Sequence, residues 1–254
     1  MPANLRLDIP RFLARLPLFG NVDADTLARL AGGCELRQLE RGDFVFRAGE
    51  PAEAFYVVVG GQVRLFVAAP NGQEKVIQLF GPGQSFAEAV MFLGAPSPVN
   101  AQALTEAVLL AVRRQAVLEE TARDSQLALR MLAGLSRRLH GLVQDVETYS
   151  LRSGVQRVIG YLLNERPVHA DGEAAPATVS LPVSKGTLAS RLSLTPEYFS
   201  RVLRELEEAG LIVVDKRDIR ILDADRLAAV EAIRARAQEI ARAARQTEIR
   251  MAQR

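Results

Sequence analysis

The sequence has one cysteine, two histidines and no long apolar run, and each of these scarcities excludes a class of protein. Because Cys34 stands alone, one chain cannot form an internal disulfide, a zinc finger or a cysteine-bound iron–sulfur cluster. No apolar run approaches the roughly 18 residues that a membrane-spanning helix needs. Charged residues interrupt Met1–Phe19, unlike the apolar core of a signal peptide. We therefore expect a cytoplasmic protein with no membrane partner.

Motifs of catalytic sites are also missing. His140 and His169 lie far apart in the sequence, and neither a nucleophile motif nor a glycine-rich phosphate-binding loop accompanies them. We therefore expect that the protein is not an enzyme. The net charge of +2 does not decide what it binds, because the local field at a contact face matters more than the total charge.

Between about Glu35 and Val112, short apolar runs alternate with glycines at intervals of about ten residues. This pattern predicts several short strands in a compact β-sandwich or β-roll. Pro70-Asn71-Gly72 predicts a hairpin turn, since Asn-Gly readily supplies positive φ angles. Short helices are expected before this region, with Asp23 as a cap. The expected strands are Phe44–Phe46, Phe55–Val59, Val63–Val67, Val76–Phe80 and Val108–Val112.

A long helix with a coiled-coil pattern is expected next. From Ala128 onwards, apolar residues recur alternately at four and three positions over about three heptads. A helix lying on the core of its own domain is the alternative, and a second, weaker apolar row supports it for part of the length. The seam is narrower than a core-facing stripe usually is, so we predict a parallel homodimer. The expected dimer contacts are Leu132, Leu135, Leu139, Leu142, Val146 and Tyr149.

Two helices with a three-residue turn are predicted after an exposed connection at Arg166–Pro182. The first runs from about Lys185 to Leu192, with Ser184 as its cap. The second begins with Thr195 as N-cap, followed by proline, and ends at Gly210.

At 100° per residue, the second of these helices has two faces. The apolar face holds Phe199, Val202, Leu203 and Leu206, and the opposite face is polar. A polar face with two arginines is typical of a recognition helix in the major groove, where arginine bonds guanine and glutamate accepts from cytosine. A solvated face with ion pairs four residues apart is the alternative. The expected DNA contacts are Lys185, Thr195, Glu197, Ser200, Arg201 and Arg204.

A β-hairpin is predicted directly after this pair of helices, from Leu211–Val214 and Ile219–Leu222 with a charged turn between them. Helix, turn, helix and wing in this order are typical of a winged helix-turn-helix, which favours DNA binding over the solvated face.

From about residue 15 to residue 225 the chain resembles the CRP/FNR superfamily of bacterial regulators. Arg41-Gly42-Asp43, Gly49-Glu50-Pro51 and Gly60-Gly61 are similar to its β-roll, and Glu197-x-x-Ser200-Arg201 is similar to the FNR-type recognition signature. The resemblance implies a homodimer on double-stranded DNA, a palindrome of TTGAT half-sites, and RNA polymerase as a partner.

Within the superfamily, Ser85–Phe92 and Leu139–Leu151 are most similar to the DNR branch. That resemblance implies regulation of denitrification genes by nitric oxide through bound haem. Arg191 stands where some members of the branch have a histidine, which departs from their pattern.

Cyclic-nucleotide binders of this superfamily hold their ligand with a segment called the phosphate cassette, which corresponds here to the residues around Phe86–Leu93. The effector prediction combines the resemblance to the DNR branch with what this cassette lacks. Glu88 matches the ribose-binding glutamate of cyclic-nucleotide binders, but Ser97-Pro98 stands where their phosphate-binding Arg-Ser pair is expected. The apolar residues of the cassette suit a flat hydrophobic ligand. We therefore predict haem as cofactor and an effector pocket made by Phe86, Glu88, Met91, Phe92 and His140.

His140 is the expected axial ligand of the haem iron, with Met91 or an exogenous ligand as alternatives. Alternatively, His140 is an ordinary residue of the helix that is exposed or hydrogen-bonded. His169 is interpreted as a solvated loop residue.

The predicted fold class is α+β in four parts. They are a sensor β-roll at 1–123, a dimerisation helix at 124–152, a winged helix-turn-helix at 153–225 and a helical extension at 226–254. The extension, in which arginines outnumber glutamates by four, is expected to pack on the winged domain or to contact phosphates or a partner. Two other functions stay open: a regulator with another small-molecule or cyclic-nucleotide effector, and a cyclic-nucleotide-binding regulatory subunit without DNA binding.

Overall fold

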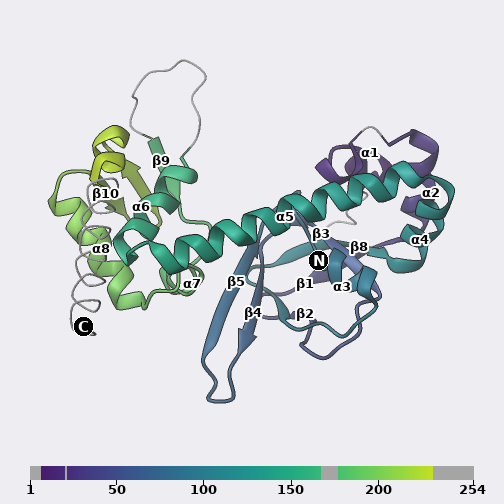
Figure 1. Ribbon diagram of the computed structural model, residues 1–254, viewed down its shortest axis with the longest axis horizontal. Coiled ribbons are helices and arrows are strands. Elements are labelled where there is room, and N and C mark those ends of the chain that lie inside the picture. Colours follow the sequence, from purple (N-terminus) through teal and green to yellow (C-terminus); the bar gives the residue numbers. More distant parts are fainter. Residues whose placement is uncertain (1–6, 21, 167–176, 231–254) are drawn as a thin grey trace, which may run out of the picture. The chain divides into compact units, whose positions relative to one another are not determined.

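The structure, a computed structural model, describes residues 7–20, 22–166 and 177–230. The chain divides into two units, residues 1–143 and 144–254 (Figure 1). His169 and most of the predicted extension at 226–254 lie outside the described residues. Among the described residues, no helix is both long and apolar enough to cross a membrane.

The first unit is built on two four-stranded antiparallel sheets, which confirms the predicted β-roll. One sheet has the strand order β1-β8-β3-β6 and the other β2-β7-β4-β5. The strands are β1 (Cys34–Leu39), β2 (Phe44–Phe46), β3 (Ala54–Gly60), β4 (Val63–Ala68), β5 (Glu74–Phe80), β6 (Ser85–Phe86), β7 (Asn100–Ala103) and β8 (Ala107–Arg113).

Short helices accompany the sheets of this unit: α1 (Ile9–Ala14), the 3-10 turn η1 (Pro17–Phe19), α2 (Ala24–Gly32), α3 (Glu88–Leu93) and α4 (Arg114–Arg123). Asp23 caps α2 as predicted, since its Oδ1 accepts a bond of 2.8 Å from the Thr26 N–H. This hydrogen bond to the charged form lowers the pKa of Asp23. In the β4–β5 turn, only Gly72 of the Asn-Gly pair takes a positive φ, of 82°.

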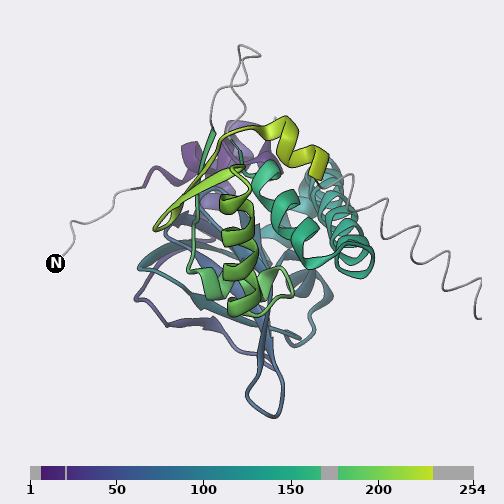
Figure 2. The same cartoon turned by 90° about the vertical axis from the view of Figure 1, so that its left-hand side faces the viewer.

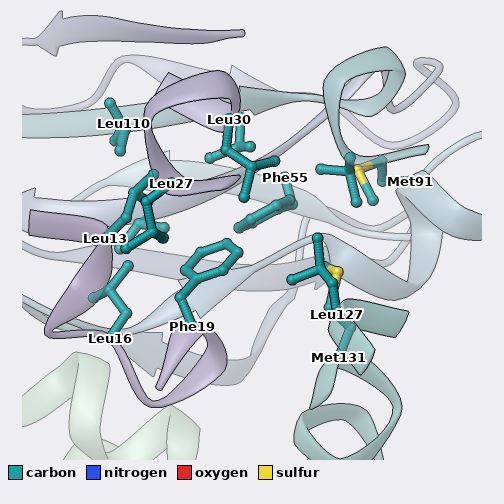
Figure 3. Close-up of a cluster of buried hydrophobic side chains, with 13 residues drawn as sticks. Leu13, Leu16, Phe19, Leu27, Leu30, Phe55, Met91, Leu110, Leu127 and Met131 are labelled. Atoms are coloured by element: carbon teal, nitrogen blue, oxygen red, sulfur yellow. The ribbon is translucent and has the colours of Figure 1, made fainter. Parts of the chain in front are cut away.

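Two apolar clusters hold the unit together. One lies among the strands around Val58, Phe80, Phe86 and Leu109. The other joins the helices to the sheet: side chains of α1, η1 and α2 meet Phe55, with Leu127 and Met131 of the following helix beside them (Figure 3). The rings of Phe19 and Phe55 are 6.3 Å apart. The carboxylate of Glu120 in α4 is buried and forms an ion pair of 2.9 Å with Arg29 in α2, which links the two helices.

The long helix α5 (Ser125–Leu151) runs from the first unit into the second. After it come α6 (Gly154–Asn164), β9 (Ala177–Ser180), α7 (Lys185–Arg191), α8 (Pro196–Glu208), β10 (Ile212–Asp215) and β11 (Asp218–Ile221). The last three strands form one sheet in the order β10-β11-β9. Figure 2 looks onto this unit, with α8 in green and the β10–β11 hairpin in yellow-green.

One segment of the predicted exposed connection is in fact a strand. Residues Ala177–Ser180 of the expected loop Arg166–Pro182 pair with β11, with Val179 opposite Ile219. Ala177 and Val179 are buried, whereas Thr178 and Ser180 are exposed. Four alternating residues are too weak a pattern to predict a strand, and their pairing partner lies about forty residues further along the chain.

Candidate nucleic-acid interface and effector cavity

The helix-turn-helix of the second unit starts both of its helices with side-chain caps. Ser184 Oγ accepts the Thr187 N–H at 3.2 Å at the start of α7, and Thr195 Oγ1 accepts the Tyr198 N–H at 3.2 Å at the start of α8. Pro196 follows the second cap, where its missing N–H costs nothing. Between the helices, Ser193 takes a φ of +56°. The predicted helices and their caps are confirmed.

Arg157 of α6 fixes the turn from behind. Its Nη1 donates to the carbonyl oxygens of Leu192 at 2.7 Å and Ser193 at 3.1 Å. Leu192 is the C-cap of α7 and Ser193 lies in the turn, so neither carbonyl takes part in the regular hydrogen bonds of the helix. Burial lowers the pKa of Arg157, and the charge on the guanidinium strengthens both bonds.

Helix α8 has the two faces that its sequence predicts. Phe199, Val202, Leu203 and Leu206 are at most 3 % exposed and face the core of the second unit. The six predicted DNA contacts lie outside that core. Glu197, Ser200, Arg201 and Arg204 are exposed along α8, Thr195 is exposed at its cap, and Lys185 is half-buried at the start of α7.

The predicted wing is the hairpin β10–β11. Asp215 pairs with Asp218 across a turn in which Lys216 has a φ of +53°. The basic side chains of this hairpin, Lys216, Arg217 and Arg220, are all exposed. The sequence analysis did not include them among the expected DNA contacts, although the charged turn that it predicted in this hairpin was a signal that could have identified them.

Helix α5 carries an exposed apolar row. Of the predicted dimer contacts, Leu132 is 58 % exposed, Leu139 and Val146 are each 64 % exposed, and Leu142 is 38 % exposed. Leu135 is half-buried. The side chain of Tyr149 lies outside the described residues. Within the second unit, Asp145 near the end of α5 bonds Arg191 of α7 at 2.7 Å, so the end of the long helix is tied to the helix-turn-helix.

The first unit contains a cavity of about 230 Å³ between the β-roll and α5. Glu88 is the one member of the predicted effector pocket that lines it, and this carboxylate is only 4 % exposed. The strands and the segment before α3 contribute Gln78, Phe80, Gly83, Gln84 and Ser85; the N-terminal segment contributes Leu16, Pro17 and Leu18; and α5 contributes Met131, Gly134, Leu135 and Arg137.

The other predicted pocket residues lie elsewhere. Phe86 and Met91 are fully buried in the two apolar clusters, and Phe92 packs against the cluster that holds Met91. His140 is exposed on α5 and does not line the cavity. Phe86 lies in β6 and Met91 in α3, and both side chains are buried in the apolar clusters of the first unit. The sequence pattern of the cassette gave no sign of the cavity residues from β5 and α5.

Ser97-Pro98 departs from the phosphate-binding pair in structure as well as in sequence. Ser97 is 3 % exposed, and its hydroxyl donates to the carbonyl oxygen of Val99 at 2.8 Å. The hydroxyl therefore serves its own loop. An arginine does line the cavity, but it is Arg137 of α5.

Two protein families match the chain in the order in which its units occur. The cyclic nucleotide-binding domain matches residues 36–124, and the Crp-like helix-turn-helix domain matches residues 156–230, so that together they cover more than half of the chain. The chain belongs to the CRP/FNR family. It is a DNA-binding transcription regulator of that type.

Individual relatives agree with this assignment. The chain is 25% identical over 216 residues to the CRP-like cAMP-activated global transcriptional regulator of Mycobacterium tuberculosis, which covers 85% of this chain and 96% of the relative. The solved structure of FixK2 from Bradyrhizobium japonicum has a TM-score of 0.68 at 23% identity, over 77% of this chain and 96% of the other, and shows the shared fold.

The structure of DNR from Pseudomonas aeruginosa is 38% identical over 86% of this chain and 96% of the other. The TM-score of this pair is 0.47. The Mycobacterium tuberculosis relative and DNR are both described as transcriptional regulators.

Proposed function

We propose that the protein binds an FNR-like palindrome as a homodimer, and that an effector in the cavity beside Glu88 controls this binding, with RNA polymerase as a further partner. The observation that carries the proposal is the exposed face of α8. Glu197, Ser200 and Arg201 stand on it in the spacing of the FNR-type signature. The buried opposite face holds the helix in its unit, so these polar side chains are free to enter a major groove.

Arg201 supplies the most direct test. Arginine bonds the two acceptors of guanine in the major groove, and losing that contact costs about 1–3 kcal/mol. We expect that Arg201→Ala weakens binding to a palindrome of two TTGAT half-sites by roughly this amount and relaxes discrimination at one base pair. Fluorescence anisotropy with labelled duplexes measures both quantities.

Random-sequence DNA is the control for this measurement. If Arg201→Ala weakens random and specific duplexes equally, the residue is a phosphate contact and the assignment to base reading fails. If the wild-type protein does not prefer the palindrome, the proposed operator is wrong.

The palindrome requires a dimer, and α5 supports one. Its apolar row at Leu132, Leu139 and Val146 is exposed in the single chain, and its four-three spacing fits a parallel pair of helices. A two-fold dimer places two recognition helices about one helical turn of DNA apart. The two-fold symmetry of the operator would then follow from that of the protein.

The lining of the cavity supports the proposal of a small effector that makes polar contacts. Its lining includes the buried Glu88 together with Gln78, Gln84 and Arg137. Since α5 contributes part of the lining, an occupant would contact both the β-roll and the helix proposed for the dimer. An effector with different affinity for two positions of this helix would shift the equilibrium between them.

Haem carrying nitric oxide is the effector that the resemblance to the DNR branch implies, and it stays a prediction. The described residues do not fit haem well. The cavity is smaller than the roughly 300–1,000 Å³ of typical ligand sites, and neither His140 nor Met91 lines it.

Two titrations on the full-length protein separate the effector classes. In the first, haem is added and the Soret band is followed, with His140→Ala as the matched variant. An unshifted Soret band in the wild type removes the haem prediction, and an equal shift in both proteins removes only His140 as the iron ligand.

In the second titration, binding of cyclic AMP is measured by calorimetry with Glu88→Gln as the variant. Binding by the wild type that Glu88→Gln weakens would favour the cyclic-nucleotide alternative.

A further inference from the structure

We propose that Tyr198 is a positioning residue that holds Arg201 in the orientation needed to read a base. The proposal rests on the base contact assigned to Arg201 under the proposed function. It adds that the specificity of this contact depends on a neighbouring aromatic ring, which does not itself need to touch DNA.

The guanidinium of Arg201 lies over the ring of Tyr198. The guanidinium carbon of Arg201 lies 4.8 Å from the centroid of the Tyr198 ring. Residues three apart share one side of a helix, and side chains lean toward its N-terminus, so Arg201 leans over Tyr198. At this distance the face of the ring attracts the cation. The guanidinium is thus held at the N-terminal half of α8, the part of a recognition helix that reaches the bases.

The ring is itself held in place by α6. A Cβ atom added to Gly154 would lie 2.5 Å from Cε1 of Tyr198 and 2.9 Å from Cδ2 of Leu194. No side chain fits between the start of α6 and the ring, and Tyr198 is half-buried as a result. The φ of Gly154 is not positive, so its backbone conformation does not require glycine. Glycine is needed because a side chain at this position would clash with Tyr198.

The contact between Arg201 and Tyr198 affects base recognition because the Tyr198 ring is fixed in position. A free arginine side chain loses rotamer entropy when it binds a base, and this loss opposes recognition. A guanidinium that already rests on a fixed ring loses less. The ring therefore favours the specific complex, in which one orientation is needed, more than loose contacts with phosphates.

The test measures discrimination at single base pairs. Wild type, Arg201→Ala, Tyr198→Leu and Tyr198→Phe are titrated against the TTGAT palindrome and against duplexes in which one base pair per half-site is changed. Arg201→Ala identifies the base pair that Arg201 reads. At that pair we expect Tyr198→Leu to lower discrimination by about 2–5-fold, the factor that corresponds to an exposed cation–π contact. Tyr198→Phe, which keeps the ring, should preserve it.

Leucine is chosen because it keeps an apolar side chain against Gly154, and circular dichroism and thermal unfolding verify that the variant is folded. A double variant, Tyr198→Leu with Arg201→Ala, should discriminate no worse than Arg201→Ala alone. If Tyr198→Leu folds poorly, Tyr198→Met, which also keeps an apolar side chain without an aromatic ring, takes its place in both the single and the double variant.

The outcomes separate the two levels of the argument. If Arg201→Ala loses discrimination and Tyr198→Leu does not, or loses it equally at every base pair, the positioning role is overturned while the base contact stands. A loss in Tyr198→Phe as large as in Tyr198→Leu also overturns it, because the hydroxyl would then be the active group. If Arg201→Ala keeps full discrimination, both the base contact and the role of Tyr198 are overturned.

Discussion

Helices α5 and α8 both carry an apolar row, yet the structure treats the two rows in opposite ways. On α8, Phe199 and Val202 are at most 1 % exposed because α6, α7 and the sheet of the same unit supply a core. On α5, Leu139 and Val146 are each 64 % exposed in the single chain. The comparison teaches that periodicity identifies which residues share a face, but does not say what covers that face.

The polar faces differ in the same manner. On α8 the residues opposite the core include the FNR-type signature. On α5 the residues away from the apolar row face different surroundings along its length, and Arg137 lines the cavity of the first unit. A helix with its apolar face covered offers its polar face for recognition, whereas a helix with an uncovered apolar face is suited to association.

The largest effect is expected in the covered row. Phe199→Ala removes a fully buried ring from the core of the second unit, and such substitutions cost about 3–5 kcal/mol. Denaturant unfolding measures the loss. The matched control on the same helix is Arg204→Ala, which is exposed and should change the free energy of unfolding by less than about 0.5 kcal/mol. Equal effects of the two would mean that α8 is not packed as described.

The uncovered row should respond in association and not in folding. Leu139→Glu together with Val146→Glu places charges in the proposed seam, where an unpaired buried charge is strongly unfavourable. We expect association to weaken by on the order of 3 kcal/mol, about a hundredfold, and operator affinity to fall with it. Sedimentation velocity measures the oligomeric state.

Gln144→Glu adds a charge on an exposed part of α5 away from the seam and serves as the control. Leu135 is left unchanged because it also lines the cavity. A double variant that still sediments as a dimer contradicts the seam.

A smaller effect is expected at the start of α8. Thr195→Ala removes the cap that accepts the Tyr198 N–H at 3.2 Å and should destabilise the second unit by about 1 kcal/mol. Thr195→Ser keeps the oxygen and should restore most of this stability in thermal unfolding. If serine and alanine behave alike, the hydrogen bond from the Tyr198 N–H contributes little to the stability of the second unit.

Elements with strong local signals were predictable from the sequence. Phe44–Phe46 and Phe55–Val59 recur as strands, and the caps at Asp23, Ser184 and Thr195 lie where expected. These features depend on a few neighbouring residues, so local chemistry determines them. The strand Ala177–Ser180 was missed because its stability comes from pairing with β11.

The candidate sites divide in the same way. The exposed face of α8 follows from helical geometry and could be predicted residue by residue. The effector pocket could not, because only Glu88 of the five predicted residues lines the cavity. The cavity lies where the N-terminal segment, β5 and α5 meet, and these segments are far apart in the sequence.

By itself, the sequence determined the order of the elements, the two faces of α8 and the presence of a uniform apolar row on α5. Tertiary structure decided that Phe86 and Met91 are core, that Tyr198 packs against Gly154 beneath Arg201, and that a cavity opens beside Glu88. The physical reason is range. Caps and helix faces depend on backbone geometry over a few residues, whereas burial and close approach depend on which distant segments fill the same space.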